Sequence, residues 1–318
     1  MDSSAFPTEM KPQFSGHETF PLRYGWLKKV HDAVTQNAEQ GIDTKEVFSS
    51  KDAIARFGVG KNMVASMRYW ALAAGMIREV RAHLGPYETT DDAELIFNDR
   101  GLDPWMEDPS TLWLLHWRFA SAPERTSTWF WLFNHCPHAS FDRSLLVDHL
   151  LRICRDRELK VAIATLKRDV ECLIRTYVDR DSAGTKEDTL ECPLTELSLI
   201  RNTGRKEMFQ IARGAKPSLP TGMLAYAVAD YWRRNFSETR TLSFDMLMHA
   251  PGSPGRVFAL DEESLADYLA ELDAETSGKL VWSETAGMRQ LISPEDPDTF
   301  DLQLLLKRSY RSTRRMAA

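Results

Sequence analysis

The sequence lacks the segments that place a protein in or across a membrane. No run of about 18 apolar residues, the length that a membrane-spanning helix needs, occurs among the 318 residues. The opening Met1-Asp2-Ser3-Ser4 has neither the basic nor the apolar region of a secretory signal. With 43% hydrophobic and 27% charged residues, the composition is that of a globular protein. We therefore expect a cytoplasmic protein with room for two or three small domains.

Cysteine is scarce, and no common nucleotide motif is present. Four cysteines stand far apart, at Cys136, Cys154, Cys172 and Cys192, so a zinc ribbon is excluded and disulfides are not expected. The run Asn134-His135-Cys136-Pro137-His138 surrounds one cysteine with two histidines. Because neighbouring side chains point in different directions, we favour a turn here over a metal site. Neither a G-x-G-x-x-G nor a Walker sequence occurs, so we expect no nucleotide cofactor.

The chain also lacks an overall excess of positive charge. Its 40 Lys and Arg against 46 Asp and Glu give a net charge of −6, which is not the basic footprint of a protein that coats nucleic acid. Any DNA binding must therefore come from local patches. Cations do gather in three places, over residues 23–29, 201–213 and 307–315.

Helical patterns dominate what is present, and they predict a mainly α protein of tandem winged-helix or helix-turn-helix units with small β-wings. Residues 47–57 have a short helical pattern, 58–60 are a glycine turn, and 61–77 have a long amphipathic pattern. Strand-like residues 77–80 and a second extended piece over 87–97 follow. A helix, a turn, a longer helix and a hairpin in this order predict a winged-helix domain.

The same order recurs further along the chain. We predict an N-terminal arm over 1–42, a winged-helix domain over 43–139, a second helix-turn-helix-like helical unit over 140–216, a C-terminal winged-helix-like unit over 217–306 and a basic tail over 307–318. The second unit contains an amphipathic helix that ends at Tyr177. The acidic residues 179–192 predict an exposed loop, and the tail predicts either a flexible basic arm or a solvated end.

An aromatic run over residues 129–134 has two interpretations. Exposed aromatic rings stack on nucleic-acid bases, so the run could be a binding surface. Large aromatic side chains are more often buried, so we favour a junction between helices.

The most distinctive block is residues 14–29, which we name the Phe14 segment. It combines the pair His17-Glu18, two glycines, a proline, four aromatic residues and three cations. Glycine suits close backbone approach, and aromatic rings beside cations suit bases and phosphates. The composition also fits a structural arm around the first domain, with His17 as a hydrogen-bonded, buried polar group.

The Phe14 segment resembles the opening of a bacterial family of domains of unknown function. That family recurs in gene clusters for single-stranded DNA phosphorothioation, where sulfur replaces a non-bridging phosphate oxygen, and its best-described member type is the SspB-like DNA-nicking subunit. The resemblance implies a DNA-binding subunit of an anti-phage defence system that nicks one strand to allow sulfur insertion. It implies a sulfur-transfer enzyme, a cysteine desulfurase and an ATPase as partners. Nicking implies Mg²⁺ or Mn²⁺ as cofactor.

Two alternatives remain open at this point. The chain could be a non-catalytic winged-helix DNA-binding regulator or adaptor in the same system, or a pure assembly scaffold. Winged-helix units also serve as protein-docking or dimer modules, and a homodimer is the expectation that follows from this class.

Candidate site residues follow from the chemistry of nicking and of DNA binding. No common nuclease spacing is clear elsewhere, so His17 and Glu18 are the candidate catalytic pair: His17 could move a proton, and Glu18 could orient His17 or hold a metal. A structural or DNA-positioning role for the pair is the alternative. Candidate DNA contacts are Arg23, Tyr24, Lys28, Lys29, Lys61, Asn62, Arg68, Lys167 and Arg168.

Overall fold

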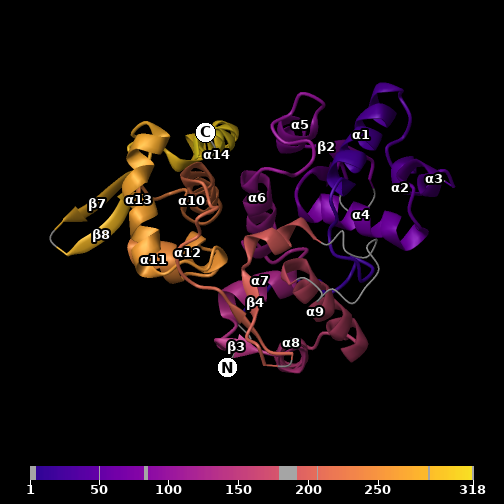
Figure 1. The fold of residues 1–318 in the computed structure, drawn as a ribbon, viewed down its shortest axis with the longest axis horizontal. Coiled ribbons are helices and arrows are strands. Elements are labelled where there is room, and N and C mark those ends of the chain that lie inside the picture. The colour runs from indigo at the N-terminus through magenta and orange to yellow at the C-terminus, as the bar shows by residue number, and fades with distance from the viewer. Residues whose placement is uncertain are drawn as a thin grey trace. The chain divides into compact units, whose positions relative to one another are not determined.

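The computed structural model describes residues 5–49, 51–81, 85–178, 192–205, 207–285 and 287–316, without the side chains of 311–316. It is mainly α-helical with small antiparallel sheets, as predicted (Figure 1). The chain forms two compact units. Unit 1 comprises Met1–Glu107, Glu124–Thr128 and Ala139–Gln210, and unit 2 comprises Asp108–Pro123, Trp129–His138 and Ile211–Ala318. Within the described ranges, we find no helix with the length and apolarity to cross a membrane.

Unit 1 begins with a helical part that ends in a hairpin. Its elements are α1 (Trp26–Glu39), α2 (Glu46–Ser49), α3 (Ala53–Phe57), α4 (Lys61–Ala73), β1 (Ile77–Glu79) and β2 (Tyr87–Thr89). The strands pair antiparallel, with Ile77 opposite Thr89. Gly58 follows α3 with φ of 67°, a left-handed conformation that suits glycine and ends the helix. The predicted glycine turn, long helix and hairpin are confirmed, whereas the short helix predicted over 47–57 is two separate helices, α2 and α3.

Two details of this part differ from the sequence expectation. The region expected as an arm contains helix α1, which packs on α4. The extended piece predicted over 87–97 was wrong beyond Thr89, because α5 (Asp91–Phe97) follows. The Thr90 side chain accepts a hydrogen bond from the Ala93 N–H, and acidic residues fill the first turn, so local capping favours helix there.

The second part of unit 1 has a three-stranded sheet. Its elements are β3 (Ser140–Phe141), α8 (Arg143–Asp156), α9 (Ile163–Tyr177), η1 (Pro193–Leu197), β4 (Ile200–Asn202) and β5 (Phe209–Ile211). The last strand lies in the middle, in the order β3-β5-β4. Asp142 caps α8 by accepting from the Leu145 N–H at 2.8 Å. The loop predicted over 179–192 lies outside the described residues except at Cys192.

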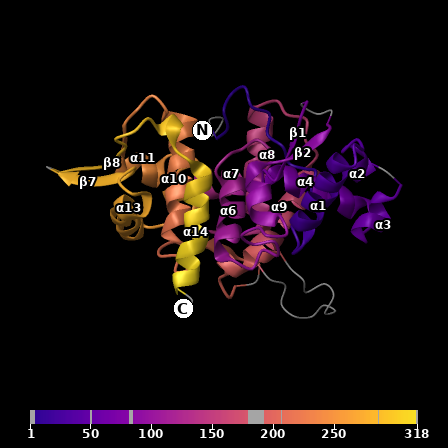
Figure 2. The ribbon, with the colours of Figure 1, turned by 90° about the horizontal axis from the view of Figure 1, so that it is seen from above.

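Unit 2 is built around helices and repeats this sheet order. Its elements are α6 (Pro109–Ala120), most of α7 (Ser127–His135), α10 (Thr221–Phe236), β6 (Thr241–Ser243), α11 (Phe244–His249), α12 (Pro254–Val257), α13 (Glu262–Thr276), β7 (Val281–Thr285), β8 (Met288–Ile292), η2 (Pro297–Thr299) and α14 (Leu302–Met316). The strand order is β6-β8-β7, again with the last strand central. Helices α10 and α14 lie side by side (Figure 2). The predicted C-terminal hairpin is confirmed.

The described residues near the C-terminus are helical. Helix α14 continues to Met316, through most of the region predicted as a basic tail. Leu306 and Tyr310 are buried, and the Tyr310 hydroxyl lies 2.8 Å from that of Thr111. Gly222 of α10 lies so close to Ser309 that an added Cβ atom would be 2.7 Å from its backbone. Helix α14 is therefore packed against α10 by its apolar side chains.

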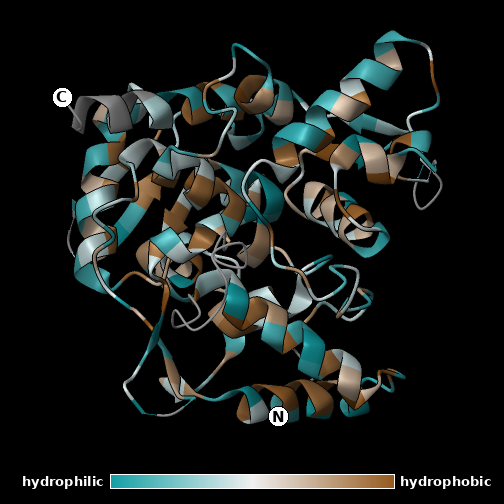
Figure 3. Ribbon diagram, turned by 45° about the vertical axis from the view of Figure 1, so that its right-hand side comes forward, coloured by the Kyte–Doolittle hydropathy of each residue, from teal (hydrophilic) through white to brown (hydrophobic). Residues whose placement is uncertain are grey.

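The aromatic run of α7 is buried, so the helix-junction interpretation is confirmed and base stacking by these rings is excluded. Trp129 and Trp131 have no exposed surface, and Phe133 has almost none. Hydrophobic and hydrophilic positions alternate along most helices of the chain (Figure 3), whereas α7 is apolar around its whole circumference, as a fully buried helix must be. The four cysteines are free thiols.

A buried histidine of α6 should make unit 2 sensitive to acid. His116 is fully buried, and its Nε2 lies 2.7 Å from the Val257 carbonyl oxygen, to which it donates. Burial lowers the pKa of His116 from 6.5 to about 3. The unfolded chain therefore takes up a proton first as the pH falls, and the free energy of unfolding should drop by about 1.4 kcal/mol per pH unit between these two values.

Urea unfolding of the wild type and of His116→Gln at pH 6.5 and pH 5 measures this effect. Glutamine keeps a hydrogen-bond donor but does not titrate, so the wild type should lose about 2 kcal/mol more than the variant over this interval. Equal losses would show that His116 does not carry the acid sensitivity.

Candidate nucleic-acid interface

The Phe14 segment is held against helix α4 by its backbone. The Phe20 carbonyl oxygen accepts from the Trp70 indole N–H at 2.9 Å and from the Ser66 hydroxyl at 3.3 Å. Gly16 faces the Tyr69 ring so closely that an added Cβ would lie 2.6 Å from it, and its φ is 119°. Glycine is required here for both reasons.

His17 lies at the centre of a buried hydrogen-bond network. It is 2% exposed, and its Nε2 lies 2.7 Å from Oδ1 of Asp169 on α9, itself 1% exposed. The Thr19 N–H donates to Nδ1 at 3.1 Å, so we assign the ring proton to Nε2. The Thr128 hydroxyl donates to the other Asp169 oxygen. Both ring nitrogens of His17 therefore have structural partners.

This network joins α4 to α9 through the Phe14 segment. The His17 ring lies 5.7 Å from the Tyr69 ring and 6.3 Å from the Trp70 ring, both on α4. From α9, Arg175 donates to the Thr19 carbonyl at 3.3 Å. The block that distinguished the sequence thus fixes two helices of unit 1 relative to each other.

Glu18 is positioned differently from its neighbour. Its side chain is exposed, and both Glu18 and Thr19 adopt left-handed φ values of 48° and 68°. This tight turn places the two members of the pair in opposite environments, His17 inside and Glu18 outside. Asp169 and Thr19, and not Glu18, orient the imidazole ring.

Arg23 and Tyr24 are half-buried just before α1 begins. The Arg23 guanidinium lies over the Trp26 ring, 5.9 Å from its centroid. The Tyr24 hydroxyl donates to the Glu196 carboxylate. Burial, together with this hydrogen bond, raises the pKa of Tyr24 well above its usual value, so the phenol stays protonated.

The two lysines of the Phe14 segment have contrasting surroundings. Lys28 is 5% exposed, and its ammonium lies 2.7 Å from both Asp32 and Asp99. Burial lowers the pKa of Lys28, but the hydrogen bonds to the two carboxylates outweigh burial and raise it above its usual value. Lys29 is exposed and donates to the Phe57 carbonyl at 3.3 Å. Lys28 is thus a structural ion-pair residue, whereas Lys29 faces solvent.

The remaining candidate contacts lie on the exposed faces of α4 and α9. Lys61, Asn62, Arg68, Lys167 and Arg168 are all exposed. Arg68 donates to the Tyr87 hydroxyl at 3.2 Å, while no carboxylate of the described residues forms an ion pair with Lys61, Lys167 or Arg168. Both helices therefore present unneutralised positive charge to solvent.

The Phe14 segment is also where the similarity to a known protein family begins. A model of the family described as "Protein of unknown function (DUF4007)" matches residues 14–310. The chain belongs to the DUF4007 family. Its match begins at Phe14, the first residue of the Phe14 segment, and runs to Tyr310 in α14, so both compact units are included.

The DUF4007 chain is similar to solved structures over nearly its whole length. A magnesium ion-bound SspB crystal structure is 30% identical, with a TM-score of 0.84, covering 98% of this chain and 92% of that one. A second SspB crystal structure is 31% identical, with a TM-score of 0.82, covering 96% and 90%. The resemblance to SspB-like proteins expected from the Phe14 segment is confirmed. No curated protein matches this chain significantly.

The magnesium in one of these SspB structures raises the question of where the DUF4007 chain could hold such an ion. The described residues contain no group of three His, Cys, Asp or Glu side chains that could surround a metal, the run 134–138 included. Mg²⁺ often binds through one or two carboxylates and keeps several waters, together with substrate phosphates. An exposed carboxylate such as Glu18 could take part in that kind of binding, in which water and phosphate oxygens supply the other ligands.

Sequence reasoning missed Asp169, which pairs with His17. A signal was present, because Asp169 falls among Leu166, Val170 and Leu173 on the apolar face of the α9 helix. A carboxylate in such a position needs a buried partner. What the sequence could not indicate was which residue supplies it.

Proposed function

We propose that this DUF4007 protein is a DNA-binding subunit of a DNA phosphorothioation system and that it nicks one strand to allow sulfur insertion. The observation that carries the proposal is the similarity to SspB structures over nearly the full length of both chains. In this proposal it works with a cysteine desulfurase, a sulfur-transfer enzyme and an ATPase. A cytoplasmic location follows from that role.

We also propose that the chain contains three winged-helix units. The supporting observation is the repeated topology: α4, α9 and α13 each precede a hairpin, and in both three-stranded sheets the last strand lies in the centre. In a winged helix, the helix before the hairpin is the one that enters the major groove. This role falls to α4 and α9, which expose cations.

DNA binding in this proposal is local and sensitive to salt. The exposed cations of α4 and α9 neutralise phosphates, and Asn62, near the first turn of α4, is suited to a base edge. Lys29, Arg23 and Tyr24 extend the contact along the Phe14 segment. Because the chain carries a net charge of −6, the remaining surface opposes DNA, and the interface depends on these few residues.

The chemical step is proposed to depend on Glu18, with His17 as the residue that positions the segment. A divalent cation held between Glu18 and a DNA phosphate would neutralise phosphate charge and activate a water molecule. His17 keeps Thr19 and Asp169 in place, so that Glu18 and α9 approach the DNA in fixed geometry. For His17 itself to act as a base, its Nδ1 would have to be released from the Thr19 N–H.

A plasmid-nicking assay with Mg²⁺ or Mn²⁺ tests the proposal. The Glu18→Gln variant should nick on the order of 100-fold more slowly than the wild type, while its DNA affinity without a divalent cation should be no weaker, because no metal bridge is then lost. Glu39→Gln, the same change at another exposed glutamate, the last residue of α1, should have no effect. Full nicking by Glu18→Gln would refute the site assignment, and an absence of relaxed plasmid with folded wild-type protein would refute nicking.

One observation favours a second function, that of a non-catalytic DNA-binding adaptor. Both ring nitrogens of His17 are engaged in hydrogen bonds within the protein. The adaptor predicts salt-dependent DNA binding without nicking. A scaffold without DNA contact predicts neither DNA binding nor nicking.

A further inference from the structure

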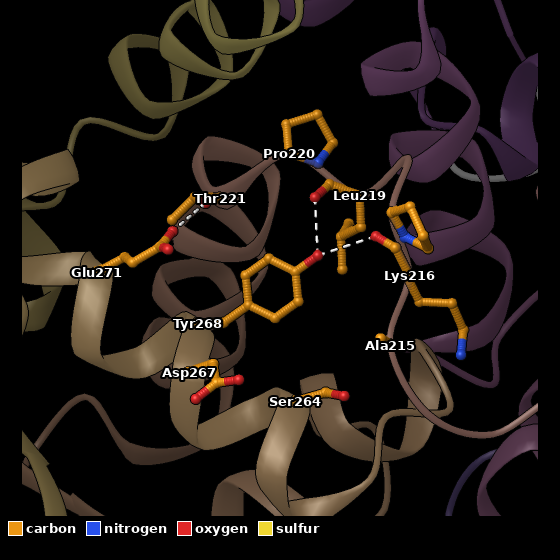
Figure 4. Close-up of a pocket in the computed structure, with 10 residues that line it drawn as sticks. Ala215, Lys216, Leu219, Pro220, Thr221, Ser264, Asp267, Tyr268 and Glu271 are labelled. Atoms are coloured by element: carbon orange, nitrogen blue, oxygen red, sulfur yellow. Dashed lines mark hydrogen bonds between the residues drawn. The ribbon is translucent and has the colours of Figure 1, made fainter. Parts of the chain in front are cut away.

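Unit 2 contains a pocket between helix α13 and the loop that leads into α10 (Figure 4). The cavity has a volume of about 440 Å³. The loop supplies an apolar wall that includes Ala215, Pro217 and Pro220, and α13 supplies Asp267, Tyr268 and Glu271. Its lining thus combines apolar surface with carboxylates.

The walls of the pocket are held in place by hydrogen bonds. The Tyr268 hydroxyl shares its one proton between the carbonyl oxygens of Lys216 at 3.0 Å and Leu219 at 2.9 Å, which the dashed lines in Figure 4 mark. The buried Lys216 ammonium donates to the Ala212, Gly214 and Ala259 carbonyls at 2.9, 2.7 and 3.1 Å. The loop is therefore fixed without a ligand, and binding would cost little ordering of the protein.

Two carboxylates of the lining, Asp267 and Glu271, outnumber its one cation, Lys216, whose ammonium is turned to backbone carbonyls. Asp267 and Glu271 are both exposed and stand one helical turn apart on α13. The Thr221 hydroxyl donates to Glu271 at 2.7 Å, and no Lys or Arg of the described residues forms an ion pair with either carboxylate. Glu263, one turn earlier, extends the same face and is also exposed.

Helix α13 contrasts with α4 and α9, although all three precede a hairpin. Helices α4 and α9 expose lysine and arginine side chains, whereas α13 exposes carboxylates. Carboxylates repel DNA phosphates and attract cationic groups. The charge of this face therefore suits a cationic group and not a DNA phosphate.

We propose that the pocket is a docking site for a basic segment of a partner protein. An arginine or lysine side chain of that segment places its aliphatic stem on Pro217 and Pro220 and its charged end at Asp267 and Glu271. Long cationic side chains combine these two properties, and the Tyr268 ring adds a cation–π surface. The proposal does not depend on DNA binding by unit 1.

Fluorescence anisotropy with a fluorescein-labelled tetra-arginine peptide tests this site. Asp267→Lys reverses a charge at the pocket, and Ala215→Trp fills the pocket without changing charge. Each should weaken peptide binding by about tenfold or more. Asp273→Lys is the matched control, because Asp273 is an exposed carboxylate of α13 outside the lining, and it should change the affinity less than about twofold.

Two results would overturn the proposal. Equal weakening by Asp267→Lys and Asp273→Lys would mean that the peptide responds only to the overall charge of the chain. Unchanged binding by Ala215→Trp would mean that the pocket is not occupied. The double variant Lys167→Glu, Arg168→Glu should bind the peptide no more weakly than the wild type, which separates this site from the DNA interface.

Discussion

Replacing His17 with alanine should lower the free energy of unfolding by about 3 kcal/mol, because one oxygen of the buried Asp169 carboxylate loses its hydrogen-bond donor and only the Thr128 hydroxyl remains. The same change removes the ring that fills the space beside Tyr69 and Trp70. Urea unfolding followed by tryptophan fluorescence measures the loss. Glu18→Ala, next to it but exposed, should change the free energy by less than about 0.5 kcal/mol.

A double-mutant cycle shows whether the effect belongs to the pair. The double variant His17→Ala, Asp169→Ala removes both partners. Its loss in free energy of unfolding should be smaller than the sum of the two single losses by at least about 1 kcal/mol. Additive losses, or a His17→Ala protein as stable as the wild type, would contradict the positioning role that we propose for His17.

Reversing the two exposed charges of α9 should have the largest effect on DNA binding. The double variant Lys167→Glu, Arg168→Glu replaces two phosphate-neutralising groups by two that repel phosphate, and we expect a loss of affinity on the order of 100-fold at low salt. The slope of log affinity against log salt should become shallower by about two, one for each lost contact. Anisotropy of a labelled DNA duplex across a salt series measures both quantities.

The matched control lies on the neighbouring helix. Arg152 and Arg155 of α8 are also exposed cations, and Arg152→Glu, Arg155→Glu makes the same change in net charge. It should reduce affinity only through that net charge and should leave the salt slope close to that of the wild type. If the two double variants behave alike, α9 has no special part in binding.

The elements that the sequence predicted well are those whose pattern repeats locally. The apolar period of α4 and the two strands on either side of Gly287 depend on neighbours a few positions away. Their ends were predicted to within a few residues. The predictions failed where two local signals competed. Capping by Thr90 overrode the extended pattern that follows β2, and the apolar stripe of α14 at Leu306 and Tyr310 was concealed by its many cations.

The site was predictable in composition but not in geometry. The sequence indicated that the Phe14 segment mattered and which exposed cations accompany it. It could not indicate that Lys28 pairs with Asp99, or that His17 pairs with Asp169, because neither pair leaves a trace in local spacing. Adjacent residues such as His17 and Glu18 were considered a pair, yet the turn at Glu18 separates them.

The bond between His17 and Asp169 spans 152 positions of the chain, which has a consequence for biosynthesis. When α1 to α4 have emerged from the ribosome, the histidine and its aromatic neighbours are in the free nascent chain, but the carboxylate that completes their burial is not. This half of the protein must therefore wait for α9 to emerge before its interior closes, and such late, distant contacts slow folding. Until then, the nascent chain exposes Tyr69 and Trp70, a surface that chaperones bind.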